Sequence, residues 1–581
     1  MPDVVRFVVC AKQTAAVLRR KPAVRYTIRF DTVAKEFPMA KKSHFLAGAL
    51  ILAVAGILSK VIGMFYRIPL QEIVGDNGLG LYQEVYPLYL TFLILATAGV
   101  PVALSRVIAE ALAEGKQGAI SQILARSMVL MGGIGIVLFA LLYLSSPLIA
   151  RMMGNPHLIE PIRAISLSLL FVPLIAVIRG FFYGHQKMLY VGLSQIVEQT
   201  LRVAFILIAS LYLVSLGEDT DQVITGVNFG TMISTFLSLG FLAFLLWRHN
   251  RKQPFATAGG WKRLDWWYDR AFFLSMWRIA WPICISALVI PIFSLVDSFL
   301  AINIFRYVWH VDGLTADTWF GIYSRGGPLL QLASLFGSSI ALSIVPAIAE
   351  ARQQRDEERV TTLTKLSLRF AWLIGLPAGL GLTAVAEGAN LALYGDVEGT
   401  RAMAILGVSA IPLSLLLATN GILQGLGREK VPALHLLWGV LAKIGTTILF
   451  TSLMGMDGLS VSWLCATALV CALNMRVINR LVKVEIQWRF DTLYPLLVAN
   501  LMLVLAWGAT EAVGFLLHGK ARLVGAAETV IGVGTGMLVY LGMLLAIPLI
   551  DEKELEWLPG GNRLRGLMNL LRRRESPTDF R

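Results

Sequence analysis

Long apolar windows follow one another along most of this chain, and short polar connections separate them. A helix of about 20 apolar residues crosses the ~30 Å hydrocarbon core of a bilayer and satisfies its own backbone hydrogen bonds. We therefore predict an all-α polytopic membrane protein with about 14 transmembrane helices. The expected spans are 45–66, 82–105, 127–146, 162–183, 193–215, 223–247, 273–303, 320–347, 366–386, 402–423, 433–454, 458–478, 493–515 and 525–550.

An internal repeat divides the first twelve spans into two units. The segment GLYQEVYPLY (80–89) returns about 240 residues later as GIYSRGGPLL (321–330), and IAEA at 108–111 returns at 348–351. Six spans per unit is an even number, so both units insert in the same orientation and form a parallel repeat. We expect two six-helix lobes, followed by two further helices.

The predicted organisation has six parts. We expect a disordered or mis-annotated extension before a natural start at Met39, two lobes joined by a basic connector, a pair of C-terminal spans and a basic tail. In chain order these parts are 1–38, 39–247, 248–270, 271–482, 483–550 and 551–581.

Composition and charge support a membrane protein. Hydrophobic residues make up 56% of the 581 positions and charged residues only 15%, which excludes an ordinary soluble domain of this length. The net charge is +14, and Lys and Arg are concentrated in alternate connections, as the positive-inside rule requires. We predict a protein of the cell membrane with both termini in the cytoplasm and no nucleic-acid partner.

Nothing in the sequence indicates an enzyme. The four cysteines and seven histidines lack metal-ligand spacing, and no Walker A, HExxH or GxSxG motif occurs in a suitable context. We expect no metal, no cofactor and no catalytic residues.

Charged residues inside the predicted spans are the candidates for function, because each costs roughly 2.5–3.5 kcal/mol at the bilayer centre. Lys60 and Arg67 are seven positions apart on the first span and share one helix face. Arg325 lies in span eight, where the repeat places it opposite Glu84. We predict that the three cations line a central cavity that binds an anion, in particular a phosphate.

Each of these residues has an alternative role. Arg67 is also compatible with snorkelling to the interface, and Arg325 with a static interlobe salt bridge to Glu84. Asp297 in span seven, like Glu84, is a candidate for ion coupling or for balancing a nearby cation. Glu198 and Arg202, four residues apart, are expected to pair within one helix.

At this point the sequence resembles a known family. The segments SKVIGMFYRIPL, TAGVPVALSRVIAEA and GIYSRGGPLL are similar to the MOP exporter superfamily, in its polysaccharide-transporter branch. That branch includes stage V sporulation protein B and the MurJ-type lipid II flippases of Gram-positive bacteria. The resemblance covers 41–550. It implies fourteen helices, with the last two bounding a lipid-tail groove, and alternating access that moves an undecaprenyl-pyrophosphate-linked saccharide between leaflets.

The resemblance also implies binding residues. The family's Ser-Arg pair and second arginine of span one correspond to Ser59-Lys60 and Arg67, and its span-eight arginine corresponds to Arg325. Ser324 stands where the family has an acidic residue before that arginine. Lys443 stands where some relatives have polar sodium ligands, so sodium coupling through that position is not expected.

These observations leave several functions open. The first is a flippase for lipid II in peptidoglycan synthesis, with the bilayer and the polyprenyl-pyrophosphate saccharide as partners and cell-wall synthesis enzymes as further candidates. A flippase for another repeat unit, such as exopolysaccharide or teichoic acid, or a sporulation-specific form, is the alternative. A cation-coupled drug exporter is disfavoured by Lys60 and Arg325, and a non-transporting scaffold would leave these cations dispensable.

Overall fold

A computed structural model describes residues 40–252, 270–484, 487–517 and 519–547. All of its regular elements are helices. The predictions for 1–38, for the tail 551–581 and for most of the connector 248–270 concern residues outside these ranges. The predicted all-α architecture is confirmed.

The N-lobe is built from the helices between residues 40 and 252. They are α2 (Ala40–Phe65), α3 (Arg67–Thr97), α4 (Val100–Ala113), α5 (Gln117–Met153), η1 (Pro156–Leu158), α6 (Ile159–Ser166), η2 (Leu167–Leu170), α7 (Val172–Gly184), α8 (Met188–Ser215) and α9 (Thr220–Lys252).

The C-lobe follows with the same pattern of long and broken helices. It contains α10 (Arg270–Ala287), α11 (Val289–Tyr307), α12 (Gly313–Ser324), α13 (Gly327–Gln353), α14 (Glu357–Ala384), α15 (Ala386–Tyr394), α16 (Thr400–Val408), α17 (Ala410–Gly425), α18 (Lys430–Met454) and α19 (Met456–Leu481). The last elements are η5 (Trp488–Leu493), α20 (Tyr494–Leu516) and α21 (Ala521–Ala546).

Thirteen helical stretches of the described chain are long and apolar enough to cross a membrane. One of them, 54–113, turns back on itself at Gly75, whose φ of 71° and ψ of 179° suit only glycine. The Tyr66 and Tyr82 hydroxyls lie 2.7 Å apart across this turn, which shows that α3 runs back beside its own start. This stretch therefore supplies two crossings, in agreement with the fourteen predicted.

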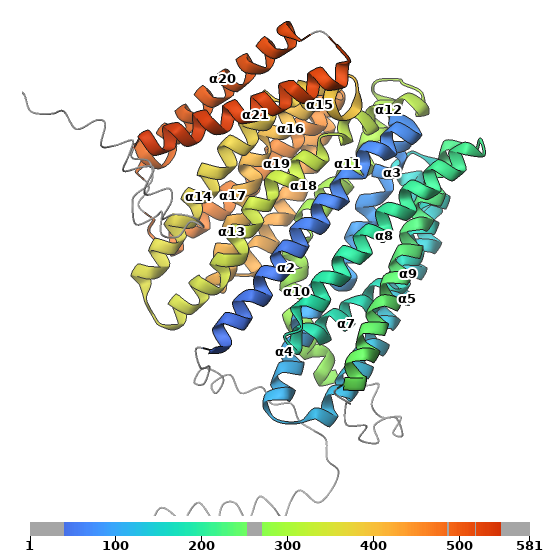
Figure 1. Cartoon of the computed structure of the whole chain (residues 1–581), viewed down its shortest axis with the longest axis vertical. Coiled ribbons are helices and arrows are strands. Elements are labelled where there is room, and N and C mark those ends of the chain that lie inside the picture. The colour runs from blue at the N-terminus through green and yellow to red at the C-terminus, as the bar shows by residue number, and fades with distance from the viewer. Residues whose placement is uncertain (1–39, 253–269, 485–486, 518, 548–581) are drawn as a thin grey trace, which may run out of the picture.

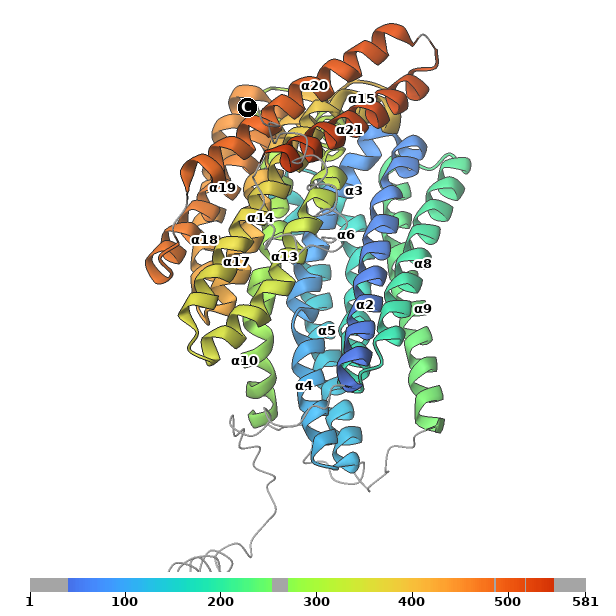
Figure 2. The same ribbon diagram turned by 60° about the vertical axis from the view of Figure 1, so that its left-hand side comes forward.

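The two lobes lie side by side, and the last two helices flank the C-lobe (Figure 1). α20 and α21 pack against each other and against α14 and α15, with Leu376, Met502 and Tyr540 in the shared core. In Figure 2 the lobes meet at the upper end of the bundle, where α3 packs on α12. We call this the clamp end.

The lobes come closest where α3 crosses α12. A methyl group on Gly80 would lie 2.0 Å from the carbonyl oxygen of Asp317, and one on Gly321 would lie 2.0 Å from that of Asp76. The two glycines are equivalent in the repeat, so the crossing has approximate two-fold symmetry. Only residues without a side chain permit this backbone contact.

Both crossing helices begin earlier than we predicted. Span two was expected at 82–105 and span eight at 320–347, whereas the helices extend back to the turn at Gly75 and to Gly313. Polar residues such as Asp76 and Asp317 placed these turns outside the predicted spans. They are helical because their side chains find partners between the lobes.

Candidate functional site

Three pairs of repeat-related residues surround the glycine crossing. Asp76 corresponds to Asp317, each four residues before its glycine, and Glu84 corresponds to Arg325, each four residues after it. Asn155 corresponds to Asp396, since each follows a left-handed glycine that ends a helix, Gly154 (φ 77°) and Gly395 (φ 87°). The six side chains form two related groups of three.

The first group is an ion-pair network that we call the Arg325 clamp (Arg325, Asp76 and Asp396). Arg325 is 1% exposed and donates to both oxygens of Asp76 at 2.9 and 2.6 Å, and to both oxygens of Asp396 at 2.6 and 3.0 Å. Asp76 belongs to the N-lobe, and the other two belong to the C-lobe. A planar guanidinium suits two bidentate carboxylates, so the clamp ties the lobes together.

The surroundings of the clamp favour its charged form. The Tyr394 ring centroid lies 4.9 Å from the guanidinium carbon of Arg325, and Asn390 accepts a further hydrogen bond at 3.5 Å. Burial alone would raise the pKa of Asp396, but the hydrogen bonds and charge of Arg325 outweigh it and hold that pKa below its ordinary value.

The clamp changes the role that we expected for Arg325. Its charge is taken up by Asp76 and Asp396, so it is not a free cation in this structure. The alternative pairing with Glu84 is wrong as well, because the partners of Glu84 are elsewhere.

The second group holds two carboxyl groups and no cation. Asn155 donates from Nδ2 to Glu84 at 3.3 Å and to Asp317 at 3.0 Å. Glu84 is fully buried and Asp317 is 6% exposed. We call Glu84 and Asp317 the acid pair. It takes the same position on the N-lobe side of the crossing that the Arg325 clamp takes on the C-lobe side.

Arg67 lies between the lobes, and no acidic side chain of the described residues forms an ion pair with it. Its guanidinium is 5.8 Å from the Tyr86 ring centroid, and its Nη1 would be 3.2 Å from a Cβ on Gly327, at the start of α13. Its Nε is buried and makes no hydrogen bond in the described structure. Arg67 is thus a partly buried cation at the lobe junction, with one nitrogen that makes no hydrogen bond among the described residues.

Ser59 and Lys60 lie two turns before Arg67, on the continuous helical segment that α2 and the start of α3 form. Lys60 is exposed, and no ion pair to it occurs among the described residues. The Ser59 hydroxyl is buried and unpartnered. Their assignment to a binding site therefore stays a prediction.

A second basic group faces α2 from α7 and α8. Glu198 accepts from Arg202 and from Arg179, each at 2.7 Å, which confirms the predicted pairing within α8 and adds an arginine that sequence reasoning missed. Gln199 of the same helix lies against Gly63 of α2. Two arginines share one carboxylate, so this group adds a net positive charge beside Lys60 and Arg67.

Asp297 is paired inside the C-lobe. Its carboxylate lies 2.6 Å from Lys443 Nζ and accepts from Trp463 Nε1 at 2.6 Å and Tyr323 Oη at 2.9 Å. Lys443 is fully buried and also donates to Ser462 at 2.5 Å. Of the two roles left open for Asp297, this geometry supports charge balance, since the ammonium group supplies the cation.

The described residues contain no group of three His, Cys, Asp or Glu side chains that could hold a metal. The residues that sequence reasoning missed are Asp76, Asn155, Asp317 and Asp396. A usable signal was present, because Gly-Asn at 154–155 and Gly-Asp at 395–396 are related by the same spacing as the two glycines of the crossing.

Comparison with known proteins gives a consistent assignment. Residues 45–352 match the model of the family described as "Polysaccharide biosynthesis protein". The chain is 30% identical over 541 residues to the uncharacterized membrane protein YabM of Bacillus subtilis, covering 92% of this chain and 98% of that one. It is 26% identical over 526 residues to the lipid II flippase MurJ of Bacillus subtilis, covering 86% and 94%. Stage V sporulation protein B of the same organism is 23% identical, covering 90% and 99%.

Two solved structures share the fold. A lipid II flippase MurJ in an inward closed conformation superposes with a TM-score of 0.62 at 13% identity, covering 85% of this chain and 99% of that one. An inward-facing multidrug resistance MATE family transporter of the MOP superfamily gives a TM-score of 0.60 at 16% identity, covering 73% and 94%. The predicted resemblance and fold class are confirmed.

Proposed function

The chain belongs to the polysaccharide biosynthesis protein family, and from this premise we propose that it is a flippase for a polyprenyl-pyrophosphate-linked saccharide, with lipid II as the substrate. The curated relative with a named activity, MurJ of Bacillus subtilis, is a lipid II flippase, which supports a transporter rather than an enzyme. YabM carries no named substrate, so the choice of lipid II is the finer part of the proposal.

One observation carries the proposal: among the described residues, Arg67 lies at the junction of the lobes with a buried Nε that makes no hydrogen bond and without a carboxylate partner. A cation in such a place is costly unless an anion or water compensates it. A pyrophosphate offers several oxygens and more than one negative charge, which suits an arginine with a nearby lysine. In our proposal Arg67, Lys60 and Ser59 hold the pyrophosphate.

The remaining parts follow from alternating access between the two lobes. The Arg325 clamp closes one end of the bundle, so substrate would enter from the other end in this state. The distribution of Lys and Arg supports an extracytoplasmic clamp end, and this orientation is part of the proposal. We propose that the polyprenyl tail lies along α20 and α21, whose outward surface is apolar, with Leu523, Val530 and Leu538 each about 70% exposed or more.

The test is flipping of labelled lipid II in proteoliposomes. Wild type should move the lipid, and Lys60→Ala and Arg67→Ala should each slow it about tenfold or more, the size expected for loss of a hydrogen bond to a charged group. Arg428→Ala, which removes an exposed arginine after α17, is the matched control and should retain wild-type rates.

A panel of substrates tests the flippase activity and the choice of lipid II separately. Other undecaprenyl-pyrophosphate saccharides, including exopolysaccharide and teichoic acid precursors, are assayed beside lipid II. Transport of one of these without lipid II would overturn the lipid II assignment and keep the flippase. Transport of none would overturn both. Transport that ignores Lys60→Ala and Arg67→Ala would overturn the site.

A further inference from the structure

The acid pair lacks a cation that its repeat-related counterpart has. At the C-lobe side of the glycine crossing, Arg325 brings a positive charge to the two carboxylates of the clamp. At the N-lobe side, the position of Arg325 is taken by Glu84, and the position of Asp396 by Asn155. The same geometry therefore holds two acidic groups with only a neutral amide between them.

Burial makes this arrangement unstable when both groups are ionised. Neither Glu84 nor Asp317 forms an ion pair within the described chain, and Glu84 Oε1 is buried without a hydrogen-bond partner. Asn155 Nδ2 contacts both carboxyl groups, which places them close together, yet two carboxylates offer only acceptors. One proton would turn one of them into a donor and remove the repulsion.

Asn155 is oriented for carboxyl groups and not for a metal. Its Oδ1 accepts from the His157 backbone N–H at 3.2 Å, which leaves Nδ2 to face Glu84 and Asp317. A metal ion would need the oxygen of that amide as a ligand. The Nδ2 group of Asn155 instead donates to both carboxyl groups, an arrangement that is compatible with one proton shared between the two acids.

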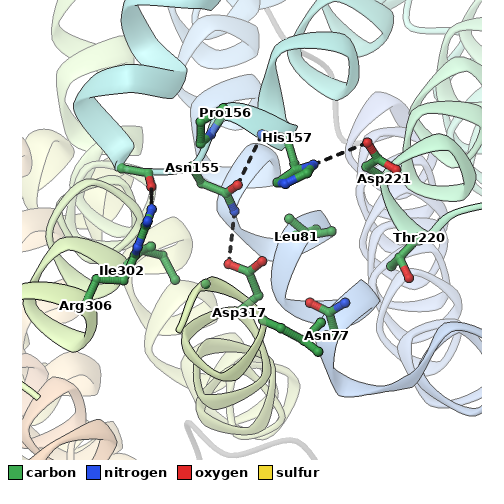
Figure 3. A pocket seen from close by; sticks show the side chains of 13 residues that line it. Asn77, Leu81, Asn155, Pro156, His157, Thr220, Asp221, Ile302, Arg306 and Asp317 are labelled. Carbon is green, nitrogen blue, oxygen red and sulfur yellow. Dashed lines mark hydrogen bonds and ion pairs between the residues drawn. The ribbon is translucent and has the colours of Figure 1, made fainter. Parts of the chain in front are cut away.

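A pocket borders Asp317 of the acid pair (Figure 3). It has a volume of about 380 Å³, and Asp317 lines it together with Asn77, Asn155, His157 and Arg306. Water in this pocket can deliver a proton to Asp317 from the clamp end. Glu84 does not line the pocket, so it would share the proton through Asp317.

Two basic side chains line the same pocket as Asp317, and neither forms an ion pair with it among the described residues. Arg306 of α11 donates to the Gly154 carbonyl at 2.5 Å and keeps its positive charge, and His157 lies 3.4 Å from Asp221 of α9. Arg179 of α7 and Arg202 of α8 share Glu198, which leaves one net positive charge in that group. On the α15 side, Asp396 belongs to the Arg325 clamp.

We propose that Glu84 and Asp317 form a proton-binding site between the lobes, and that the bound proton holds the clamp end closed. Loss of the proton leaves two buried carboxylates from different lobes facing each other, and their repulsion favours separation. Coupling of this site to lipid transport rests on the proposed function, whereas proton binding and its effect on the lobes do not.

The experiment measures lobe separation in the purified full chain in nanodiscs. Spin labels are placed at Leu216→Cys in the N-lobe and Tyr307→Cys in the C-lobe, both exposed at the clamp end, in a background without the native cysteines. In wild type, raising the pH from about 5 to about 9 should shift the distance distribution from short to long. Glu84→Gln, which mimics the protonated acid, should stay short at every pH, as should Asp317→Asn.

Two matched variants test other titrating groups. Asp221→Asn removes an acid from the same pocket, and His157→Gln removes the neighbouring imidazole; both should keep the full pH response. Infrared difference spectra provide the second measurement, with a protonated-carboxyl band at low pH that Glu84→Gln reduces.

Four results would overturn the proposal. They are a wild-type distance that ignores pH, a pH response that survives Glu84→Gln, a response abolished by His157→Gln, and closure of the clamp end by Na⁺ at high pH, which would make this a metal-cation site. Failure of lipid II transport would leave the distance measurements unaffected, so it would count against the proposed function alone.

Discussion

Gly80 and Gly321 meet back to back at the crossing of α3 and α12, and each faces the carbonyl oxygen that lies four residues before the other. This contact positions both the Arg325 clamp and the acid pair. Its symmetry follows from the repeat, since equivalent glycines of the two lobes occupy the same axis.

The first prediction concerns these glycines. Gly80→Ala and Gly321→Ala should each force the helices apart and destabilise the closed clamp end by about 1–3 kcal/mol, the usual range for overpacking. Thermal unfolding in detergent and the spin-label distance measure the effect. Gly133→Ala is the control, since a methyl group there meets nothing within 4 Å; equal destabilisation by all three variants would contradict the prediction.

The second prediction concerns Arg325. Arg325→Ala should leave Asp76 and Asp396 facing each other and cost about 3–5 kcal/mol, the range for breaking a buried ion pair. Arg325→Lys should recover only part of this, because an ammonium group cannot bind two carboxylates in bidentate fashion. A lysine variant as stable as wild type in thermal unfolding would show that geometry is unimportant there.

The third prediction separates the clamp from the acid pair by pH. The pKa of Asp396 lies below its ordinary value, so the stabilisation from its ionised form is complete above the unfolded pKa of about 3.8 and is lost as pH falls through the folded value. The clamp should therefore contribute a constant amount between pH 5 and 9. In an Asp396→Asn variant, the change of lobe distance across that range should match wild type in direction and midpoint.

The fourth prediction concerns Asp297 and Lys443. Replacing either one alone, as in Asp297→Asn or Lys443→Met, should strongly destabilise the C-lobe, because it leaves one buried charge unpaired. The double replacement Asp297→Leu with Lys443→Met should recover much of the loss. Stability measured with and without Na⁺ should not differ in wild type, since the ammonium group occupies the cation's place; Na⁺-dependent stabilisation that disappears in Asp297→Asn would contradict this.

The sequence was sufficient for the fold and for part of the site. Apolar windows and the repeat predicted the helices and the two lobes, and mid-span charge singled out Lys60, Arg67, Arg325 and Asp297. The partners were harder to predict because they depend on contacts between distant segments. Asp76 and Asp396 lie outside the predicted spans, and the packing of α3 and of the loop after α15 places them beside Arg325.

The same limit explains the acid pair. The repeat pointed to Glu84 as the equivalent of Arg325 and suggested that the two would face each other. In the structure, however, the residue four positions after each crossing glycine lies near the aspartate four positions before the other glycine. Arg325 meets Asp76, and Glu84 meets Asp317 through Asn155. One group is an ion pair and the other an acid pair because Glu84 stands at the position of Arg325 and Asn155 at that of Asp396. The hydrophobic pattern of the sequence does not reveal the consequence of these single differences.

The last prediction tests Arg67 as a pyrophosphate ligand. Arg67→Lys keeps the charge but loses the planar set of donors, so binding of undecaprenyl pyrophosphate in nanodiscs should weaken about tenfold. Lys60→Arg, on the accessible part of the same helix face, should bind at least as tightly as wild type, because it adds donors without crowding a buried partner. Binding that is indifferent to Arg67→Lys but abolished by Arg67→Gln would show that Arg67 acts by charge alone, and the bidentate geometry would have to be abandoned.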